Sequence, residues 1–257
     1  SHPYVVIAPS YMVYSIDFDQ FIHTHIDSGA DVTLLYHSVD NAKEAYLTCN
    51  VLNLNRQKGV EAIGPNHGNK KNQNIYMDTC VMKTELFISL VREAKKLSSM
   101  YTLADILNDK CETLDIRGVA HKGFFASITD FPSYYAANMD LLDYKAAQEL
   151  FHENWPIYTR TNDSCPTQYF DTAEVKNSVI SNGCQIEGTV ENSVIGRGCV
   201  IKKGAVVKDS VILPGVVIGE DAQIEAQVVD KSARIVHAKE LIADPEKPGY
   251  VRRNDTL

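Results

Sequence analysis

Histidine and cysteine are the side chains whose spacing would reveal a metal or nucleophilic site, and both are scattered along this chain of 257 residues. Among the eight histidines only His23 and His25 lie close together, and a separation of two suits a strand face, whereas these two lie in a helical pattern. We therefore predict no metal site there. The six cysteines form no Cys-x-x-Cys pair, so we predict neither a disulfide framework nor a zinc cluster, but reduced thiols that are buried or half-buried. They are Cys49, Cys80, Cys111, Cys165, Cys184 and Cys199.

The composition is that of an ordinary globular protein with an excess of acidic residues. Hydrophobic residues make up 44% of the chain and the formal net charge is −8, which excludes a disordered or fibrous chain. No run of Lys or Arg is longer than two, so we expect neither nucleic acid nor a membrane as a partner, because both need clustered positive charge. No uncharged apolar stretch approaches the length of about 20 residues that spans a bilayer. The N-terminus lacks the features of a signal peptide, so we expect a cytoplasmic protein.

The last third of the chain repeats itself. Residues 173–180, 188–195, 205–212 and 222–229 align by eye, and their starts are 15, 17 and 17 residues apart. Aliphatic side chains recur within them at steps of six, which matches neither a helix nor a flat strand. Three faces of six residues make one coil of about 18, so the repeat predicts a parallel β-helix whose coils stack and bury an aliphatic core. The predicted inward ladder runs through Val194, Val200, Val206, Ile212, Ile218 and Ile224, with Ile195, Ile201, Val207 and Leu213 as a parallel row.

The repeat region carries few side chains that could do chemistry. Residues 173–236 contain no histidine, and His237 lies just beyond them. Hexapeptide β-helices often use a histidine base for acyl transfer, so we expect this one to be structural or oligomerising instead. An acyltransferase with His121 or His237 as its base remains an alternative. The cationic residues Arg197, Lys202 and Lys203 are interpreted as solvated corner charges rather than an anion site.

The first 150 residues alternate between strand and helix patterns. Residues 4–8 and 31–36 are predicted strands, and the helix between them begins after Asp17, which caps it, and ends near Gly29. A strand, a helix and a strand in this order indicate a parallel sheet of the α/β class. Further helices are predicted after Thr84, after Thr102 and over residues 132–151. We place the domain boundary before the prolines at 156 and 166, giving an α/β domain over residues 1–155 and a β-helix domain over residues 156–257.

The chain resembles the glucose-1-phosphate adenylyltransferases of bacterial glycogen synthesis. The resemblance rests on residues 5–7, 13–18 and 134–142, on His25 followed by residues 29–33, and on the Asn-Ser-Val-Ile repeats. It implies a Rossmann-like nucleotidyltransferase domain followed by a left-handed parallel β-helix. It also implies that the Gly-rich loop that binds ATP phosphates, with about the first 100 residues of the family pattern, lies outside this chain.

The positions that carry the family's chemistry have changed in this chain. In the family two carboxylates hold the metal for nucleotidyl transfer, and here the aligned residues are Tyr11 and Ser127, whose neutral oxygens are poor ligands for Mg²⁺. The Ser-Met-Gly stretch that helps to hold the sugar aligns with Tyr76, Met77 and Asp78. The family's Glu-Lys-Pro has no counterpart between residues 46 and 74. If the alignment is shifted, Asp17, Asp78 or Asp130 could supply a metal ligand instead, although Asp17 fits better as a helix cap.

These departures have the pattern of the regulatory, non-catalytic type of subunit known in some Gram-positive bacteria. The resemblance then implies a partner, the catalytic subunit, in a hetero-oligomer that is a tetramer, with homo-oligomers formed through the β-helix as a further option. It implies that Mg²⁺ and ATP are used by that catalytic partner, and that this chain holds no cofactor, no metal and no catalytic residue. An active nucleotidyltransferase whose phosphate loop lies upstream of this chain is the other alternative.

Overall fold

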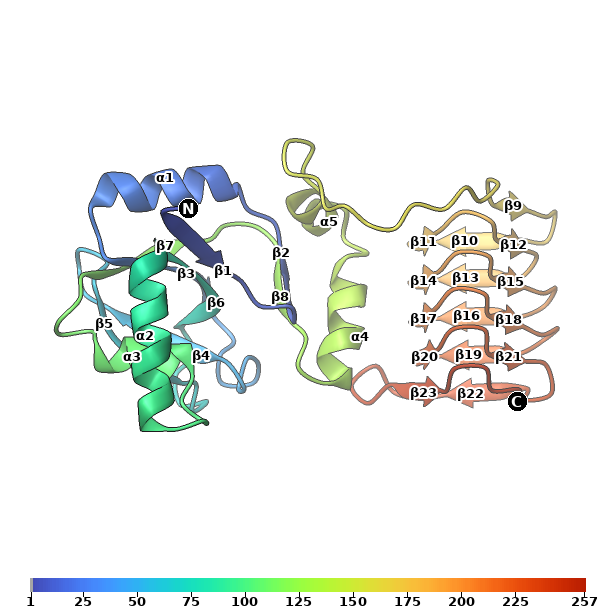
Figure 1. The fold of residues 1–257 in the computed structure, drawn as a ribbon. Helices are drawn as coiled ribbons and strands as arrows, with labels where there is room; N and C mark the ends of the chain where they lie inside the picture. The colour runs from blue at the N-terminus through green and yellow to red at the C-terminus, as the bar shows by residue number, and fades with distance from the viewer. Residues whose placement is uncertain (1) are drawn as a thin grey trace. The chain divides into compact units, whose positions relative to one another are not determined.

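A computed structural model describes residues 2–257 (Figure 1). It divides into two compact units, of which the first ends at Ser127 and the second begins at Ile128. Each unit has its own hydrophobic core. No helix within residues 2–257 is both long enough and apolar enough to cross a membrane.

The first unit is built on a mixed sheet with the strand order β5-β4-β6-β3-β7, and β1 also pairs with β6. The α/β class is confirmed, but the expected parallel sheet is found only between β3 and β7. β1 and β3 run in the same direction, yet the long strand β6 lies between them and is antiparallel to both. The strands are β1 (Tyr4–Ile7), β3 (Val32–Val39), β4 (Asn50–Leu54), β5 (Val60–Pro65), β6 (Gln73–Lys83) and β7 (Ile116–Ala120), with β2 (Met12–Tyr14) and β8 (Phe125–Ser127) forming a separate antiparallel pair.

Three helices cover this sheet, and local signals define their ends. In α1 (Phe18–Ser28) the Asp17 carboxylate accepts from the backbone N–H of Gln20, and Gly29 ends the helix at a φ of 68°. α2 (Thr84–Leu97) follows β6 directly. α3 (Leu103–Asp109) begins with a complete capping box between Thr102 and Asp105. α2 and α3 contribute to the core on one face of the sheet, and α1 to the core on the other.

The helix predicted over residues 132–151 is two helices, α4 (Phe131–Asp140) and α5 (Tyr144–Leu150). The break occurs at residues 141–143, where the Asp143 side chain accepts from the backbone N–H of Ala146 and starts α5. Both helices belong to the second unit, and Tyr135 of α4 packs on Val211 and Val228 of the β-helix. Its hydroxyl also donates to the Asp209 carbonyl. The compact units therefore divide at 127/128 and not at the predicted boundary of 155/156.

The rest of the second unit is a parallel β-helix, as predicted. Its coils stack three sheets, which Figure 1 shows as columns of short parallel strands. One sheet contains β10 (Glu174–Lys176), β13 (Thr189–Glu191), β16 (Val206–Lys208), β19 (Gln223–Glu225) and β22 (Glu240–Ile242). The second contains β11 (Val179–Ile180), β14 (Val194–Ile195), β17 (Val211–Ile212), β20 (Gln227–Val229) and β23 (Gly249–Val251). The third contains β9 (Gln168–Tyr169), β12 (Gln185–Ile186), β15 (Val200–Ile201), β18 (Val217–Ile218) and β21 (Arg234–Ile235).

The inward row begins on the predicted parallel row, at Ile195, Ile201 and Val207, and crosses to the predicted ladder at Ile212. The buried row steps by six residues from Ile195 to Ile201 and Val207, then by five to Ile212, and by six again to Ile218 and Ile224. Its members pair with residues 17 positions further on, as Ile201 does with Ile218. One face of each such coil is therefore a residue shorter, so the predicted ladder of constant step follows the outer side chains Val194, Val200 and Val206 before it reaches the true inner row.

The Asn-Ser motif, which reads Asp209-Ser210 in the third repeat and Ala226-Gln227 in the fourth, lies at one corner of the coils. Asn177, Asn192 and Asp209 adopt left-handed backbone conformations with φ between 44° and 49°, which Asn and Asp tolerate better than most residues. Their side chains form a ladder, in which the Asn192 amide accepts from Asn177 at 2.9 Å and donates to Asp209 at 2.6 Å. The next residue is a serine whose hydroxyl accepts a backbone N–H of the following coil, as Ser193 does from Ser210. The motif thus satisfies the polar groups of the corners.

Candidate functional site

Three of the positions that the resemblance predicts to be degenerate, Tyr11, Asp78 and Ser127, lie close together in the first unit. Tyr11 precedes β2, and β2 pairs with β8 so that Met12 lies opposite Ser127. The Tyr11 hydroxyl donates to Oδ2 of Asp78 on β6. Beside them the Cys49 thiol donates to the Ser127 hydroxyl at 3.4 Å. We refer to Tyr11, Cys49, Asp78 and Ser127 as the hydroxyl cluster.

An irregularity in β6 presents Asp78 to this cluster. Leu34 pairs with Cys80 and Tyr36 with Tyr76, so the three residues 77–79 of β6 are set against Leu35 alone on β3. Within this bulge Asp78 has a φ of 48°, the left-handed backbone conformation that Asp tolerates better than most residues. Its neighbours Tyr76 and Met77 are buried in the two cores on opposite faces of the sheet. Of the three residues aligned with the sugar-binding stretch, Asp78 is the one that lies in the hydroxyl cluster.

Burial dominates the electrostatics of the cluster. It raises the pKa of Asp78, while the hydrogen bond from Tyr11 acts in the opposite direction. Burial, together with the hydrogen bond to Asp78 and its charge, raises the pKa of the Tyr11 phenol. Burial also raises the pKa of the Cys49 thiol, and the nearby Asp78 adds to that effect. The cluster therefore brings at most one negative charge, on Asp78, at neutral pH.

These residues do not fit a Mg²⁺ ion. Mg²⁺ is bound by carboxylates and substrate phosphates in near-ideal octahedral geometry, whereas the one carboxylate here already accepts a hydrogen bond from Tyr11. Across residues 2–257 there is no group of three His, Cys, Asp or Glu side chains placed to hold a metal. The other carboxylates considered from the sequence are helix caps, since Asp17 caps α1 and Asp130 caps α4 by accepting the Ser133 N–H at 2.8 Å.

A histidine pair lies near the ends of β3 and β7, and the sequence pattern did not indicate it. Nδ1 of His37 lies 3.0 Å from Nδ1 of His121, and Nε2 of His121 lies 3.0 Å from the Ser15 carbonyl oxygen. Burial and the neighbouring His121 lower the pKa of His37 to about 4. Both ring nitrogens of His121 are thus engaged within the protein, and His237, the other candidate base, is an exposed residue of the second unit. Neither arrangement supports acyl transfer. Only the pairing of β3 with β7 brings His37 and His121 together.

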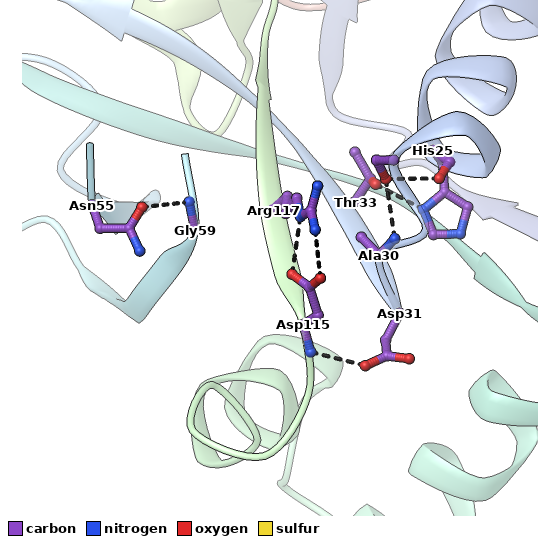
Figure 2. A network of polar contacts seen from close by, with 9 residues as sticks. His25, Ala30, Asp31, Thr33, Asn55, Gly59, Asp115 and Arg117 are labelled. Carbon is purple, nitrogen blue, oxygen red and sulfur yellow. Dashed lines mark hydrogen bonds and ion pairs between the residues drawn. The ribbon is translucent and has the colours of Figure 1, made fainter. Parts of the chain in front are cut away.

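The remaining polar residues of the resemblance have structural roles (Figure 2). His25 of α1 is buried, and its Nδ1 lies 2.7 Å from the Thr33 hydroxyl on β3. Asp31 accepts the backbone N–H of Asp115, and Asp115 in turn forms an ion pair with Arg117 at 2.7 Å. This network connects α1 to the beginnings of β3 and β7. His23 lies on the exposed side of α1, so the two histidines do not form a shared site.

All six cysteines are free. Five are buried or half-buried as predicted, but Cys165 is exposed, because it lies in the segment that leads into the first coil. Cys184 and Cys199 occupy equivalent positions in neighbouring coils, and their thiols donate to the carbonyls of Gly196 and Leu213 at 3.1 and 3.2 Å.

Removing the Tyr11 hydroxyl is expected to destabilise the first unit more at neutral than at acidic pH. Tyr11→Phe leaves the partly buried Asp78 carboxylate without its donor, which should cost about 1 kcal/mol at pH 7. The cost should shrink once Asp78 is protonated. The matched control is Tyr14→Phe, because the Tyr14 hydroxyl bonds the neutral Thr79 at 2.5 Å and its loss should not depend on pH. Urea unfolding at pH 7 and pH 4 measures both. Equal pH dependence in the two variants would show that Asp78 does not depend on Tyr11.

Comparisons with known proteins match the repeats of the second unit to a family and most of the chain to longer relatives. The family model described as "GlmU-like, C-terminal hexapeptide" matches residues 166–250. Glycogen biosynthesis protein GlgD of Geobacillus stearothermophilus is 33% identical over 79% of this chain and 49% of its own length. Glucose-1-phosphate adenylyltransferase of Fervidobacterium nodosum is 28% identical over 90% of this chain and 56% of its own length.

GlgD of Bacillus subtilis is 27% identical over 97% of this chain and 62% of its own length. The chain thus spans about half to three fifths of the curated relatives it matches. The resemblance indicated by the sequence motifs is confirmed, and over most of its length the chain is similar to the GlgD and glucose-1-phosphate adenylyltransferase proteins of glycogen biosynthesis.

Proposed function

We propose that this chain serves glycogen biosynthesis as a regulatory, non-catalytic subunit of glucose-1-phosphate adenylyltransferase. The reaction that it would modulate joins ATP and glucose 1-phosphate to give ADP-glucose and diphosphate. Two similar proteins carry the name glycogen biosynthesis protein and others the name of the enzyme, which supports a role in this process.

The observation that carries the proposal is the hydroxyl cluster. Nucleotidyl transfer between two phosphates needs a cation to neutralise their charge. At the positions where the family pattern places carboxylates this chain has a phenol and an alcohol, and Tyr11 engages the adjacent carboxylate of Asp78. Such a cluster favours a chain that leaves Mg²⁺ and ATP to its catalytic partner.

The β-helix offers a surface for that partner. β9, β10 and β11 are the terminal strands at one end of its three sheets, opposite β21, β22 and β23, and terminal strands present backbone groups that another chain can pair with. Tyr169, Val175 and Val179 in these strands are exposed apolar residues. They support contact with a catalytic subunit in a hetero-tetramer, and the same surface could serve a homo-oligomer.

An activity assay with and without a catalytic subunit tests the proposal. This chain, incubated with ATP, glucose 1-phosphate and Mg²⁺, is expected to form no ADP-glucose. Added to a catalytic glucose-1-phosphate adenylyltransferase of the same organism, it should change the concentration of activator needed for half-maximal rate by about five-fold or more.

A variant of the terminal strands β10 and β11 tests whether this surface contacts the catalytic subunit. Val175→Lys combined with Val179→Lys places two charges on the exposed surface without entering the core, and it should abolish the effect on the catalytic subunit. Turnover by this chain alone would contradict the proposal and favour an active nucleotidyltransferase. Unchanged kinetics of the catalytic subunit in the presence of this chain would contradict the regulatory role.

A further inference from the structure

A second candidate site lies in the first unit, at the end of β3 and the beginning of β6. It is a cavity of about 1030 Å³ whose lining comes from residues 37–41, 46, 52–54, 61, 70 and 72–74. This set shares no residue with the hydroxyl cluster. Ligand sites commonly measure about 300–1,000 Å³, so the cavity has room for an extended ligand. Side-chain amides are the commonest polar groups in the lining, and we therefore call this site the amide cavity. The amides belong to Asn41, Asn53, Asn72, Gln73 and Asn74.

The charges of the amide cavity are unfavourable for a phosphorylated ligand. Its lining contains the carboxylates of Asp40 and Glu61 and a single ammonium group, on Lys70. His37, which also lines it, is neutral at pH 7 because burial lowers the pKa of its imidazole to about 4. Phosphate binding is usually secured by several cationic or backbone N–H donors. The lining therefore favours a polar but uncharged ligand.

One wall of the amide cavity is aromatic and held in place by stacking. The Tyr46 ring lies parallel to Phe125, with 5.6 Å between the ring centroids and 10° between the planes. Phe125 in turn packs against His37 at 5.2 Å, and His37 against His121 at the same distance. This row fixes the ring of Tyr46 beside the amides.

The loop that carries Tyr46 is held by a buried asparagine. Nδ2 of Asn66 donates to the carbonyls of Ala42, Ala45 and Tyr46 at 2.9 to 3.3 Å, and its Oδ1 accepts the Gly68 N–H. Tyr46 itself adopts a φ of 58°, which is uncommon for a bulky residue. Such strain persists only where the surroundings impose it, and it is concentrated at binding sites. The aromatic wall is therefore preorganised, which lowers the entropic cost of binding.

We propose that the amide cavity binds a neutral oligosaccharide. Each sugar hydroxyl both donates and accepts hydrogen bonds, and so does each Asn or Gln side chain, so the two groups match in any orientation. The apolar face of a pyranose ring can pack on the face of Tyr46, whose side chain is only partly buried. This binding function does not depend on the regulatory role proposed above, because it involves a different set of residues.

Saturation-transfer NMR with two uncharged probes tests the proposal. Maltohexaose and cellohexaose are each mixed with the full chain, and saturation of at least one of them is expected. Glucose 1-phosphate in excess should not displace the bound hexasaccharide, because the cavity lacks a cluster of cations. Saturation of neither sugar would overturn the proposal. Displacement by glucose 1-phosphate would also overturn it, since the site would then be one for phosphates.

Amide variants locate the binding. Asn53→Ala and Gln73→Ala remove lining amides whose side chains lie at or near the surface, and each should weaken hexasaccharide affinity by about ten-fold. The matched control is Gln57→Ala, an exposed amide in the turn between β4 and β5 outside the cavity lining. It should leave the affinity unchanged. Equal loss in all three variants, or loss in none, would contradict binding in the amide cavity, while the test of the regulatory role would be unaffected.

Discussion

Replacing Ile201 by alanine is expected to lower the free energy of unfolding of the β-helix by about 2–5 kcal/mol. Ile201 is fully buried in the aliphatic core and is paired along its sheet with Ile186 and Ile218. The substitution leaves a cavity that neighbouring coils cannot fill, because their positions are set by parallel pairing on both sides. Since each coil is stabilised mainly by its neighbours, the loss should reach the adjacent coils. Urea unfolding followed by far-UV circular dichroism measures it.

The neighbouring residue provides the control for this result. Val200 lies in the same strand, β15, but is only partly buried and faces away from the core. Val200→Ala should cost about 1 kcal/mol or less. The pair therefore tests the phase of the inward ladder directly. A larger loss for Val200→Ala than for Ile201→Ala would show that the ladder of constant step predicted from the sequence is the correct one.

The first unit is expected to lose stability as the pH falls from 6.5 toward 4, and His37 should account for about 2 kcal/mol of that loss. Its pKa is lowered from 6.5 to about 4 in the folded state, mainly by burial and then by His121. Between pH 6.5 and 4 the His37 side chain is therefore protonated in the unfolded chain but neutral in the folded chain, so the free energy of unfolding decreases as the pH falls. The value of about 2 kcal/mol is smaller than the full pKa shift of His37 would give, because the side chain is partly exposed and solvent screens its charge.

Unfolding curves of His37→Phe against pH isolate this contribution. Phenylalanine keeps the contact with Phe125 but cannot take up a proton, so the difference in unfolding free energy between the original chain and the variant should change by about 2 kcal/mol between pH 7 and pH 4. His23→Phe, at an exposed position of α1, is the matched control and should follow the original chain. A difference for His37→Phe that does not vary with pH would contradict the neutral, buried state of His37.

Helix ends were the most predictable part of the fold, because capping interactions connect residues only three positions apart. The caps at Asp17 and Thr102 and the terminating Gly29 are all found where the sequence places them. The break between α4 and α5 was missed, although an Asp directly before a helical run, as Asp143 is before Tyr144, is itself a start signal. The apolar residues at 139, 142 and 146 continue a helical pattern across the break, and that pattern outweighed the local cap.

The sheet order of the first unit could not be predicted from the same local signals. β1 and β3 are neighbours in sequence, separated by one helix, and such strands usually lie side by side. Here β6, which begins more than thirty residues after β3 ends, pairs with both. Which strand lies between β1 and β3 depends on which one can pair with both while its side chains pack into the cores on the two faces of the sheet. Only the complete set of packed side chains decides this.

The candidate site was likewise predictable only in part. The uncharged residues Tyr11 and Ser127 and the carboxylate of Asp78 are visible in the sequence, because they are differences in residue type from the pattern that the resemblance predicts. That Tyr11 donates to Asp78, 67 residues away, depends on the bulge in β6 and on the pairing of β2 with β8. The histidine pair and the amide cavity likewise arise from residues that the sheet brings together.

By itself, then, the amino-acid sequence determined the two architectures, the stacking of the repeats and the uncharged side chains of Tyr11 and Ser127, because residue types, periodicity and local caps can be read along the chain. The tertiary structure alone decided the strand order, the phase of the inward ladder and the contacts of Asp78, His37 and Tyr46. These features are set by pairings between distant segments, whose free energy is gained only when the strands and helices pack together.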